Sequence, residues 1–283
     1  MPLLHDPEVL AAILAAPPPP DPTPPPVGDI ATRRRNATAN FDMIGATYPA
    51  VAGVTVERDV LVTADGAELA LLWYQPDVTE SAGGAALYLH GGGMILDLEH
   101  TGRGYDAVVR SYVAHSGVPM LMVDYRAAPE HPHPTPAEDC YAALCWTAAN
   151  AEELGIDADR LLVTGGSAGG ALSAALCLMT RDRGGPKIAY QGLMIPVLDD
   201  RLDQPSHKQA EMAEGFSGRG AIGMWLHYLG EDYDREKTSP YAAPARSEDL
   251  SGLPPAFIQT NGLDPLRDEG IQFALRLMAE GID

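Results

Sequence analysis

Two segments near the start of the patterned part of the chain alternate apolar and polar side chains. Residues 54–62 and 68–74 have the period of strands with two unlike faces, and Ala64-Asp65-Gly66 between them is typical of a hairpin turn. Later apolar segments are short and nearly continuous, as in strands buried on both faces. They lie at 85–89, 119–123, 160–164, 189–196 and 256–260. The pattern therefore predicts an antiparallel pair followed by buried strands.

Helical periodicity fills the intervals between the buried strands. The predicted helices cover about 102–116, 136–153, 168–182 and 265–280. Strands that alternate with helices usually form a parallel sheet with helices on both faces. We therefore predict an α/β protein with a mostly parallel central sheet.

Two regions interrupt this alternation. In residues 1–50, a short apolar helix at about 3–16 precedes the proline-rich run 17–26, which is predicted to be an extended spacer. Residues of about 200–232 begin polar and end with apolar side chains at helical spacing. This second region is predicted to be an inserted helical cap.

The amino-acid composition of the chain argues against some classes of binding partner. The 283 residues include 19 Lys and Arg against 39 Asp and Glu, a net charge of −20, which repels phosphate backbones and anionic lipid. No run of about 20 apolar residues is present, so neither nucleic acid nor a membrane span is expected. The acidic N-terminus does not favour a signal peptide. Cys140, Cys145 and Cys177 are expected to be buried thiols, which indicates a reducing, cytoplasmic location.

The strongest chemical signal is Gly165-Gly166-Ser167-Ala168-Gly169-Gly170, between a predicted strand and an apolar helix. A serine nucleophile needs such a tight turn, since the turn exposes the hydroxyl and the helix offers amides to an oxyanion. Small residues are needed at 165 and 169, where backbones approach closely. The alternatives are a plain glycine-rich turn or a nucleotide loop. The spacing does not match GxGxxG, and no Lys follows as in a Walker loop.

A second glycine motif, His90-Gly91-Gly92-Gly93, directly follows the strand 85–89. Consecutive glycines let backbone N–H groups face a reacting carbonyl oxygen, which is the chemistry of an oxyanion hole. We expect His90 to brace this loop rather than act as a base. The alternative is a flexible loop without a catalytic role.

Two polar loops complete the set of motifs. Residues 124–134 read DYRAAPEHPHP, a proline-stiffened loop in which charged groups are expected to pair beneath the site. His131 and His133 lack an obvious third ligand nearby, so no metal is expected. Asp264 follows the strand 256–260, where a carboxylate can orient a histidine, although it can equally be a helix N-cap.

Taken together, these motifs resemble the hormone-sensitive-lipase-like carboxylesterases of the α/β-hydrolase superfamily over residues 50–283. The resemblance implies an α/β-hydrolase fold with a helical cap, no cofactor, and short-to-medium acyl esters as small-molecule substrates. It divides the chain into a cap segment, 1–50, and a catalytic domain, 51–283, with the insertion at about 200–232. It assigns Ser167 as nucleophile, Asp264 as acid, and the amides of Gly91, Gly92 and Ala168 as oxyanion donors.

Four further residues are expected to shape the substrate pocket. Met94 and Ile95 directly follow the glycines and are expected to line it. Trp225 and Tyr228 of the insertion are expected to close it, although they can equally be the core of a cap helix. Sequence does not separate an esterase from a lactone or amide hydrolase, which share a tetrahedral intermediate.

The resemblance leaves the general base open. In the family a histidine follows the acid by about 30 residues, whereas this chain has no histidine after Asp264. A shortened chain is the favoured explanation. The alternatives are a histidine from the cap, such as His207, or from a partner chain, and a non-catalytic binding protein. A shortened chain would leave the strand 256–260 as an uncovered sheet edge, so a homodimer is expected.

Overall fold

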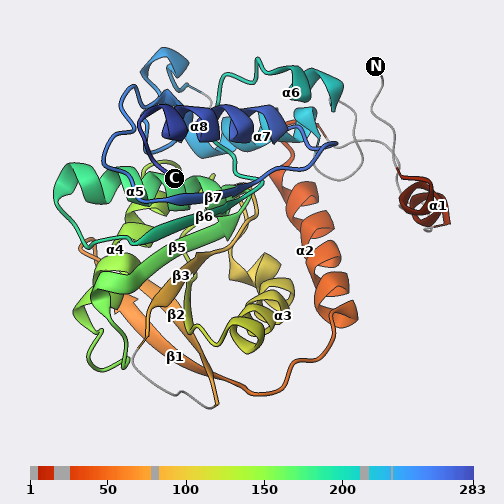
Figure 1. Ribbon diagram of the computed structural model, residues 1–283. Coiled ribbons are helices and arrows are strands. Elements are labelled where there is room, and N and C mark those ends of the chain that lie inside the picture. Colours follow the sequence, from red (N-terminus) through yellow and green to blue (C-terminus); the bar gives the residue numbers. More distant parts are fainter. Residues whose placement is uncertain (1–5, 16–25, 78–82, 211–216, 231) are drawn as a thin grey trace.

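The computed structural model describes residues 6–15, 26–77, 83–210, 217–230 and 232–283. In this part of the chain seven strands form one sheet in the order β1-β2-β4-β3-β5-β6-β7 (Figure 1). The pairs β1–β2 and β2–β4 are antiparallel, and the other pairs are parallel. The strands are β1 (Val54–Val62), β2 (Glu68–Pro76), β3 (Ala85–Leu89), β4 (Met120–Val123), β5 (Leu161–Gly166), β6 (Tyr190–Met194) and β7 (Ala256–Gln259). The predicted α/β class and mostly parallel sheet are confirmed.

Helices cover both faces of this sheet. The helix α3 (Leu98–Ser116) packs Val109 and Val113 against Tyr74 and Tyr88 on one face. The other face carries α4 (Thr135–Ala149), α5 (Ala168–Arg183) and α8 (Arg267–Ala279). Such a layered arrangement buries the apolar side chains of the sheet and of the helices against one another.

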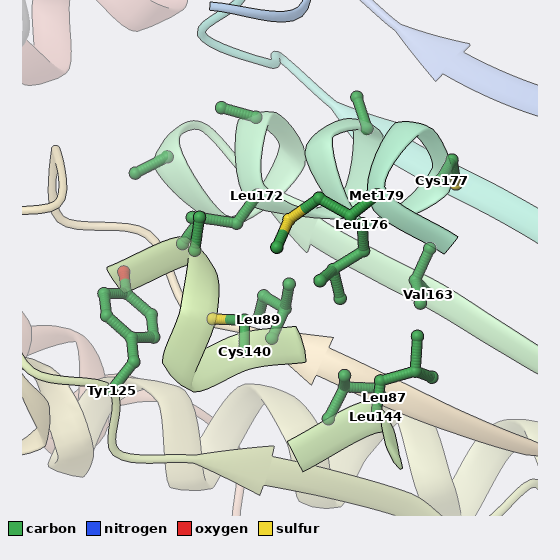
Figure 2. Close-up of a cluster of buried hydrophobic side chains, with 14 of the residues drawn as sticks. Leu87, Leu89, Tyr125, Cys140, Leu144, Val163, Leu172, Leu176, Cys177 and Met179 are labelled. Atoms are coloured by element: carbon green, nitrogen blue, oxygen red, sulfur yellow. The ribbon is translucent and has the colours of Figure 1, made fainter. Parts of the chain in front are cut away.

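The main core lies between the central strands and two of these helices. Figure 2 shows side chains from both: Leu87 and Leu89 on β3, Val163 on β5, Cys140 and Leu144 on α4, and Leu172, Leu176 and Met179 on α5. Every residue of α5 from Ala168 to Thr180 is buried. Because a fully buried leucine side chain contributes about 2 kcal/mol, this helix is a main source of stability. It also carries the nucleophile turn at its start.

Four helices lie in the two predicted cap regions: α1 (Pro7–Ala15), α2 (Ile30–Thr47), α6 (Pro205–Gln209) and α7 (Gly218–Leu229). Three short 3-10 helices lie elsewhere, at Ala158–Arg160, Arg235–Lys237 and Pro244–Arg246. Residues 1–5, nearly all of the proline-rich run and residues 211–216 of the insertion lie outside the described residues.

The helix α2 is a feature that the sequence pattern did not predict. None of its residues is fully buried, and Ile30, Ala37 and Phe41 are only partly buried against the core, so its apolar pattern is weak. The carboxylate of Asp29 accepts a hydrogen bond from the Thr32 N–H at 3.0 Å and starts the helix. It lies beside α3, where Phe41 packs on Gly104, and a Cβ at Gly104 would lie 2.8 Å from the Phe41 ring. Among the described residues, no helix combines the length and the apolar character needed to cross a membrane.

Candidate active site

Ser167 lies at the sharp turn between β5 and α5. Its backbone has φ +56° and ψ −116°, a conformation that non-glycine residues rarely adopt and that costs about 1–3 kcal/mol. The Ser167 N–H donates to the Met194 carbonyl at 2.9 Å, and its own carbonyl accepts from the N–H groups of Ala171 at 3.1 Å and Val197 at 3.2 Å. Three backbone hydrogen bonds therefore hold the strained residue in place.

The glycines around this turn allow backbones to touch. A Cβ at Gly169 would lie 1.8 Å from the Leu89 carbonyl oxygen, and one at Gly165 would lie 2.3 Å from the same atom. A Cβ at Gly166 would have only the Met194 carbonyl oxygen near it, at 3.9 Å. Positions 165 and 169 thus require glycine, in agreement with the sequence argument, whereas position 166 has room for a side chain.

The glycine loop after β3 lies directly against Ser167. A Cβ at Gly91 would lie 3.6 Å from the Ser167 Cβ and 2.4 Å from the Tyr105 hydroxyl oxygen. Burial raises the pKa of Tyr105 to about 12, and the backbone N–H of Gly91, hydrogen-bonded to this hydroxyl, partly opposes the rise. The Tyr105 hydroxyl therefore lies beside Gly91, whose amide is one of the three predicted to bind an oxyanion. Tyr105 was missed because it lies in an ordinary helical pattern on α3.

His90 has the geometry of a brace. Its Nδ1 lies 2.8 Å from the Gly91 carbonyl oxygen, and its ring stacks on Tyr125 at 4.1 Å between centroids. The Tyr125 hydroxyl donates to the His90 carbonyl at 2.9 Å. Complete burial lowers the pKa of His90 to about 4, so the ring is neutral at pH 7. Because these contacts fix the backbone at His90 and Gly91, His90 stabilises the loop that carries the glycines.

The loop 124–134 is held beneath the site by charge pairing. The Arg126 guanidinium contacts the buried Asp139 carboxylate at 2.7 and 2.9 Å, and its outer nitrogen reaches Asp65 at 2.8 Å. His133 Nδ1 lies 3.3 Å from the Tyr228 hydroxyl, and burial lowers the pKa of His133 to about 4. Across the described residues, no group of three or more His, Cys, Asp or Glu is placed to hold a metal ion.

Asp264 lies between β7 and α8. The carboxyl ends of parallel strands meet at one edge of a sheet, so Asp264 and Ser167 lie at the same edge with β6 between their strands. One carboxylate oxygen of Asp264 accepts a hydrogen bond from the Leu266 N–H at 2.8 Å. Burial raises the pKa of Asp264, which this N–H and the nearby His207 oppose. The N-cap of α8 is Leu266, so the alternative prediction that Asp264 is the N-cap is wrong, and Asp264 instead closes the turn that precedes the helix.

A buried histidine–glutamate pair joins α6 to α8, close to Asp264. His207 Nε2 on α6 lies 3.3 Å from Glu269 Oε2 on α8, and both side chains are almost completely buried. The other oxygen of Glu269 accepts from the Leu198 N–H at 2.7 Å, next to the Val197 amide that binds Ser167. Burial raises the pKa of Glu269 to about 7. Glu269 was not predicted, because its helical position gives no sign of its partner.

The four expected pocket residues lie in the buried interface between cap and sheet. Met94, Ile95, Trp225 and Tyr228 are all buried within the main hydrophobic core. Tyr228 packs edge-on against His133, with 5.6 Å between ring centroids. Met224, which was not predicted, lies over the glycine loop, since a Cβ at Gly93 would be 2.9 Å from its Cγ. The contacts of Trp225 and Tyr228 are those of core side chains, and a pocket role for all four residues stays a prediction.

A serine in a strained strand-to-helix turn beside a glycine loop defines an α/β hydrolase. The family model for the alpha/beta hydrolase fold matches residues 86–283, and the chain belongs to this family. Carboxylesterase NlhH of Mycobacterium tuberculosis is 39% identical over 211 residues, which are 74% of this chain and 65% of that protein. Esterase LipI of the same organism is 38% identical over 209 residues, which are 73% of this chain and 63% of LipI.

Solved structures agree with this assignment. A bacterial heroin esterase superposes with a TM-score of 0.89 at 38% identity, covering 98% of this chain and 86% of that protein. The resemblance to hormone-sensitive-lipase-like esterases is therefore confirmed. The chain spans slightly less than two thirds of the length of the two mycobacterial relatives.

Proposed function

We propose that the protein is a serine carboxylesterase that hydrolyses small-molecule esters with short-to-medium acyl chains. The observation that carries this proposal is Ser167, held in a left-handed conformation by three backbone hydrogen bonds and faced by the glycine loop. Relatives named as esterases support the choice of ester substrates. The chemistry requires no cofactor.

In this mechanism Ser167 Oγ attacks the ester carbonyl carbon while a base takes its proton. The tetrahedral intermediate collapses, the alcohol leaves, and water hydrolyses the acyl-enzyme in the same way. Ala168 begins α5, and the first N–H groups of a helix have no partner within it. We assign the oxyanion to the amides of Gly91, Gly92 and Ala168. Met94 and Ile95 are proposed to line the acyl or alcohol pocket.

The base in this proposal is a histidine that Asp264 orients. His207 lies close enough to Asp264 for its charge to lower the pKa of that carboxyl. Its Nε2, however, faces Glu269 at 3.3 Å, and its side chain is only 5% exposed. His207 is therefore a candidate to be tested beside Ser167, not the assigned base.

Hydrolysis of a short p-nitrophenyl ester tests the proposal, with Ser167→Ala as control. Turnover that vanishes in Ser167→Ala supports a serine esterase, and its loss in His207→Gln as well would assign the base to His207. If the chain is inert, the assay is repeated with the strand and histidine loop of the family appended. An extended chain that is also inert would favour a binding protein that holds an ester or acid without turnover.

We also propose a cytoplasmic location. The structure contains three free cysteines, of which Cys140 and Cys177 are buried. Burial raises the pKa of both thiols, so they are unreactive and suited to a reducing compartment. Fractionation of the host cell, with the protein followed by mass spectrometry, checks this location.

A further inference from the structure

The glycine loop has positive φ angles at three consecutive residues. Gly92, Gly93 and Met94 have φ values of +123°, +65° and +55°. Glycine adopts such values without difficulty, but a methionine does so only where surrounding contacts hold it. The position of the Gly92 amide therefore depends on whatever restrains the end of this loop.

Two restraints come from the α/β body. The Ile95 N–H donates to the Gly92 carbonyl at 3.1 Å and closes a turn. The Ala128 N–H donates to the Met94 carbonyl at 2.7 Å, which joins the glycine loop to the loop 124–134. Both bonds use backbone groups, and neither fixes the carbonyl of Ile95.

A third restraint comes from the N-terminal cap. Arg34 on α2 donates from Nε to the Ile95 carbonyl at 3.0 Å and from Nη2 to the Ala128 carbonyl at 3.0 Å. Its Nη1 and Nη2 also donate to the two carboxylate oxygens of Glu130, at 2.7 and 2.6 Å. One guanidinium thus ties together the glycine loop, the loop 124–134 and α2.

We propose that Arg34 is a positioning residue for the oxyanion hole, through which the N-terminal helix α2 sets the geometry of the glycine loop. The inference rests on the proposed esterase function, in which the Gly92 amide receives the oxyanion. Arg34 lies in a helix with no buried residue, so its contribution comes from these polar contacts rather than from core packing.

The geometry requires arginine rather than a positive charge in general. A planar guanidinium donates in several fixed directions, whereas a lysine ammonium is a point charge on a flexible stem and cannot reproduce the fork. Glu130 aligns the guanidinium from the opposite side, and the Arg34 contact lowers the pKa of Glu130 to about 2. Arg35 is a matched control, since it has the same charge, lies one residue further along α2, is exposed, and bonds to Thr32 Oγ1 within its own helix.

Kinetics of Arg34→Ala, Arg34→Lys and Arg35→Ala test the proposal. We expect kcat to fall about 10- to 100-fold in both Arg34 variants, less than the loss of an oxyanion donor, with KM changed little. Arg35→Ala should match the wild type. Guanidinium ion added to Arg34→Ala should restore part of kcat. Full activity in Arg34→Lys, or a loss that follows thermal unfolding alone, would overturn the proposal.

Hydrogen exchange provides a readout independent of turnover. The peptide covering residues 91–98 should exchange faster in Arg34→Ala than in the wild type or Arg35→Ala. If neither the wild type nor the extended chain hydrolyses an ester, the proposed function fails, and this comparison still decides the role of Arg34. Equal exchange in the three proteins would exclude Arg34 as a restraint on the glycine loop.

Discussion

Ser167 and Asp264, the proposed nucleophile and acid, lie at the carboxyl ends of two strands whose surroundings differ. Ser167 follows the central strand β5, has three backbone hydrogen bonds, and stands among glycines that touch neighbouring backbone. Asp264 follows the edge strand β7, in which no residue is fully buried, and its carboxylate accepts a single backbone hydrogen bond among the contacts described. Backbone sterics thus determine the geometry around Ser167, here called the nucleophile side. Side-chain electrostatics and contacts from α6 determine the surroundings of Asp264, here called the acid side.

The largest effect on activity should come from Asp264→Asn, a variant that tests whether Asp264 takes part in catalysis. Asparagine can still accept the hydrogen bond from the Leu266 N–H, so the free energy of unfolding should change by less than about 1 kcal/mol. Turnover should fall about 10⁴-fold, because an amide cannot orient and stabilise a histidine cation as a carboxylate does.

The measurement is kcat/KM for a short ester, beside a urea unfolding curve of each protein. Pro265→Ala, next in the chain, is the control and should retain most of the activity. Equal activity of Asp264→Asn and the wild type would show that Asp264 only closes the turn before α8.

Gly169→Ala against Gly166→Ala tests the steric control of the nucleophile side. A Cβ at 169 would lie 1.8 Å from the Leu89 carbonyl oxygen, so the turn must shift, and we expect a loss of about 3 kcal/mol or failure to fold. At 166 the nearest atom is 3.9 Å away, and the change should remain within about 1 kcal/mol. Urea unfolding distinguishes the two, and equal stability would contradict the steric account.

This contrast also explains how much the sequence revealed. The requirement for glycine at 165 and 169 follows from local chain geometry, so the motif pointed to the turn and to its chemistry. The hairpin turn was equally local: Gly66 has φ +86°, and the strands pair on either side of it as predicted.

What could not be predicted depends on contacts between distant segments. Arg34 and Glu130 are 96 residues apart, and no periodicity marks either one. The helix α2 was not predicted because none of its residues is fully buried, although Phe41 packs against Gly104 and Tyr105 of α3. Glu269 lies in an ordinary amphipathic helix, and only the fold reveals that its neighbours are His207 and the Leu198 amide.

The pH dependence of the free energy of unfolding in Glu269→Gln tests the electrostatics of the acid side. Burial raises the pKa of Glu269 to about 7 from an ordinary 4.5, so the folded protein binds more protons than the unfolded chain between these values. The free energy of unfolding should therefore fall by about 1–3 kcal/mol as pH rises from 5 to 8. Glutamine stays neutral and still accepts from Leu198, so this decline should be smaller in the variant.

Asp268→Asn provides the matched control for the pH series. The Asp268 carboxylate pairs with Arg267, and this contact lowers its pKa from 3.8, the opposite direction to Glu269. Its contribution is complete above pH 5, so this variant should change stability equally at pH 5 and 8. A parallel pH dependence in Glu269→Gln and the wild type would show that Glu269 does not titrate in this range.

The smallest effect on stability, and the clearest on assembly, should come from Phe257→Lys on β7. Phe257 is 56% exposed at the sheet edge beside β6, where Tyr190 is 42% exposed. Exposed apolar edges pair with other chains, and lysine at an edge prevents this. We expect the wild type to self-associate in light scattering as concentration rises and Phe257→Lys to stay monomeric, with stability changed by about 0.5 kcal/mol or less. Ile222→Lys, at a position that is 45% exposed but on the helix α7, should behave as the wild type. A wild type that remains monomeric at high concentration would show that this edge, despite its exposed Phe257, does not bind a second copy.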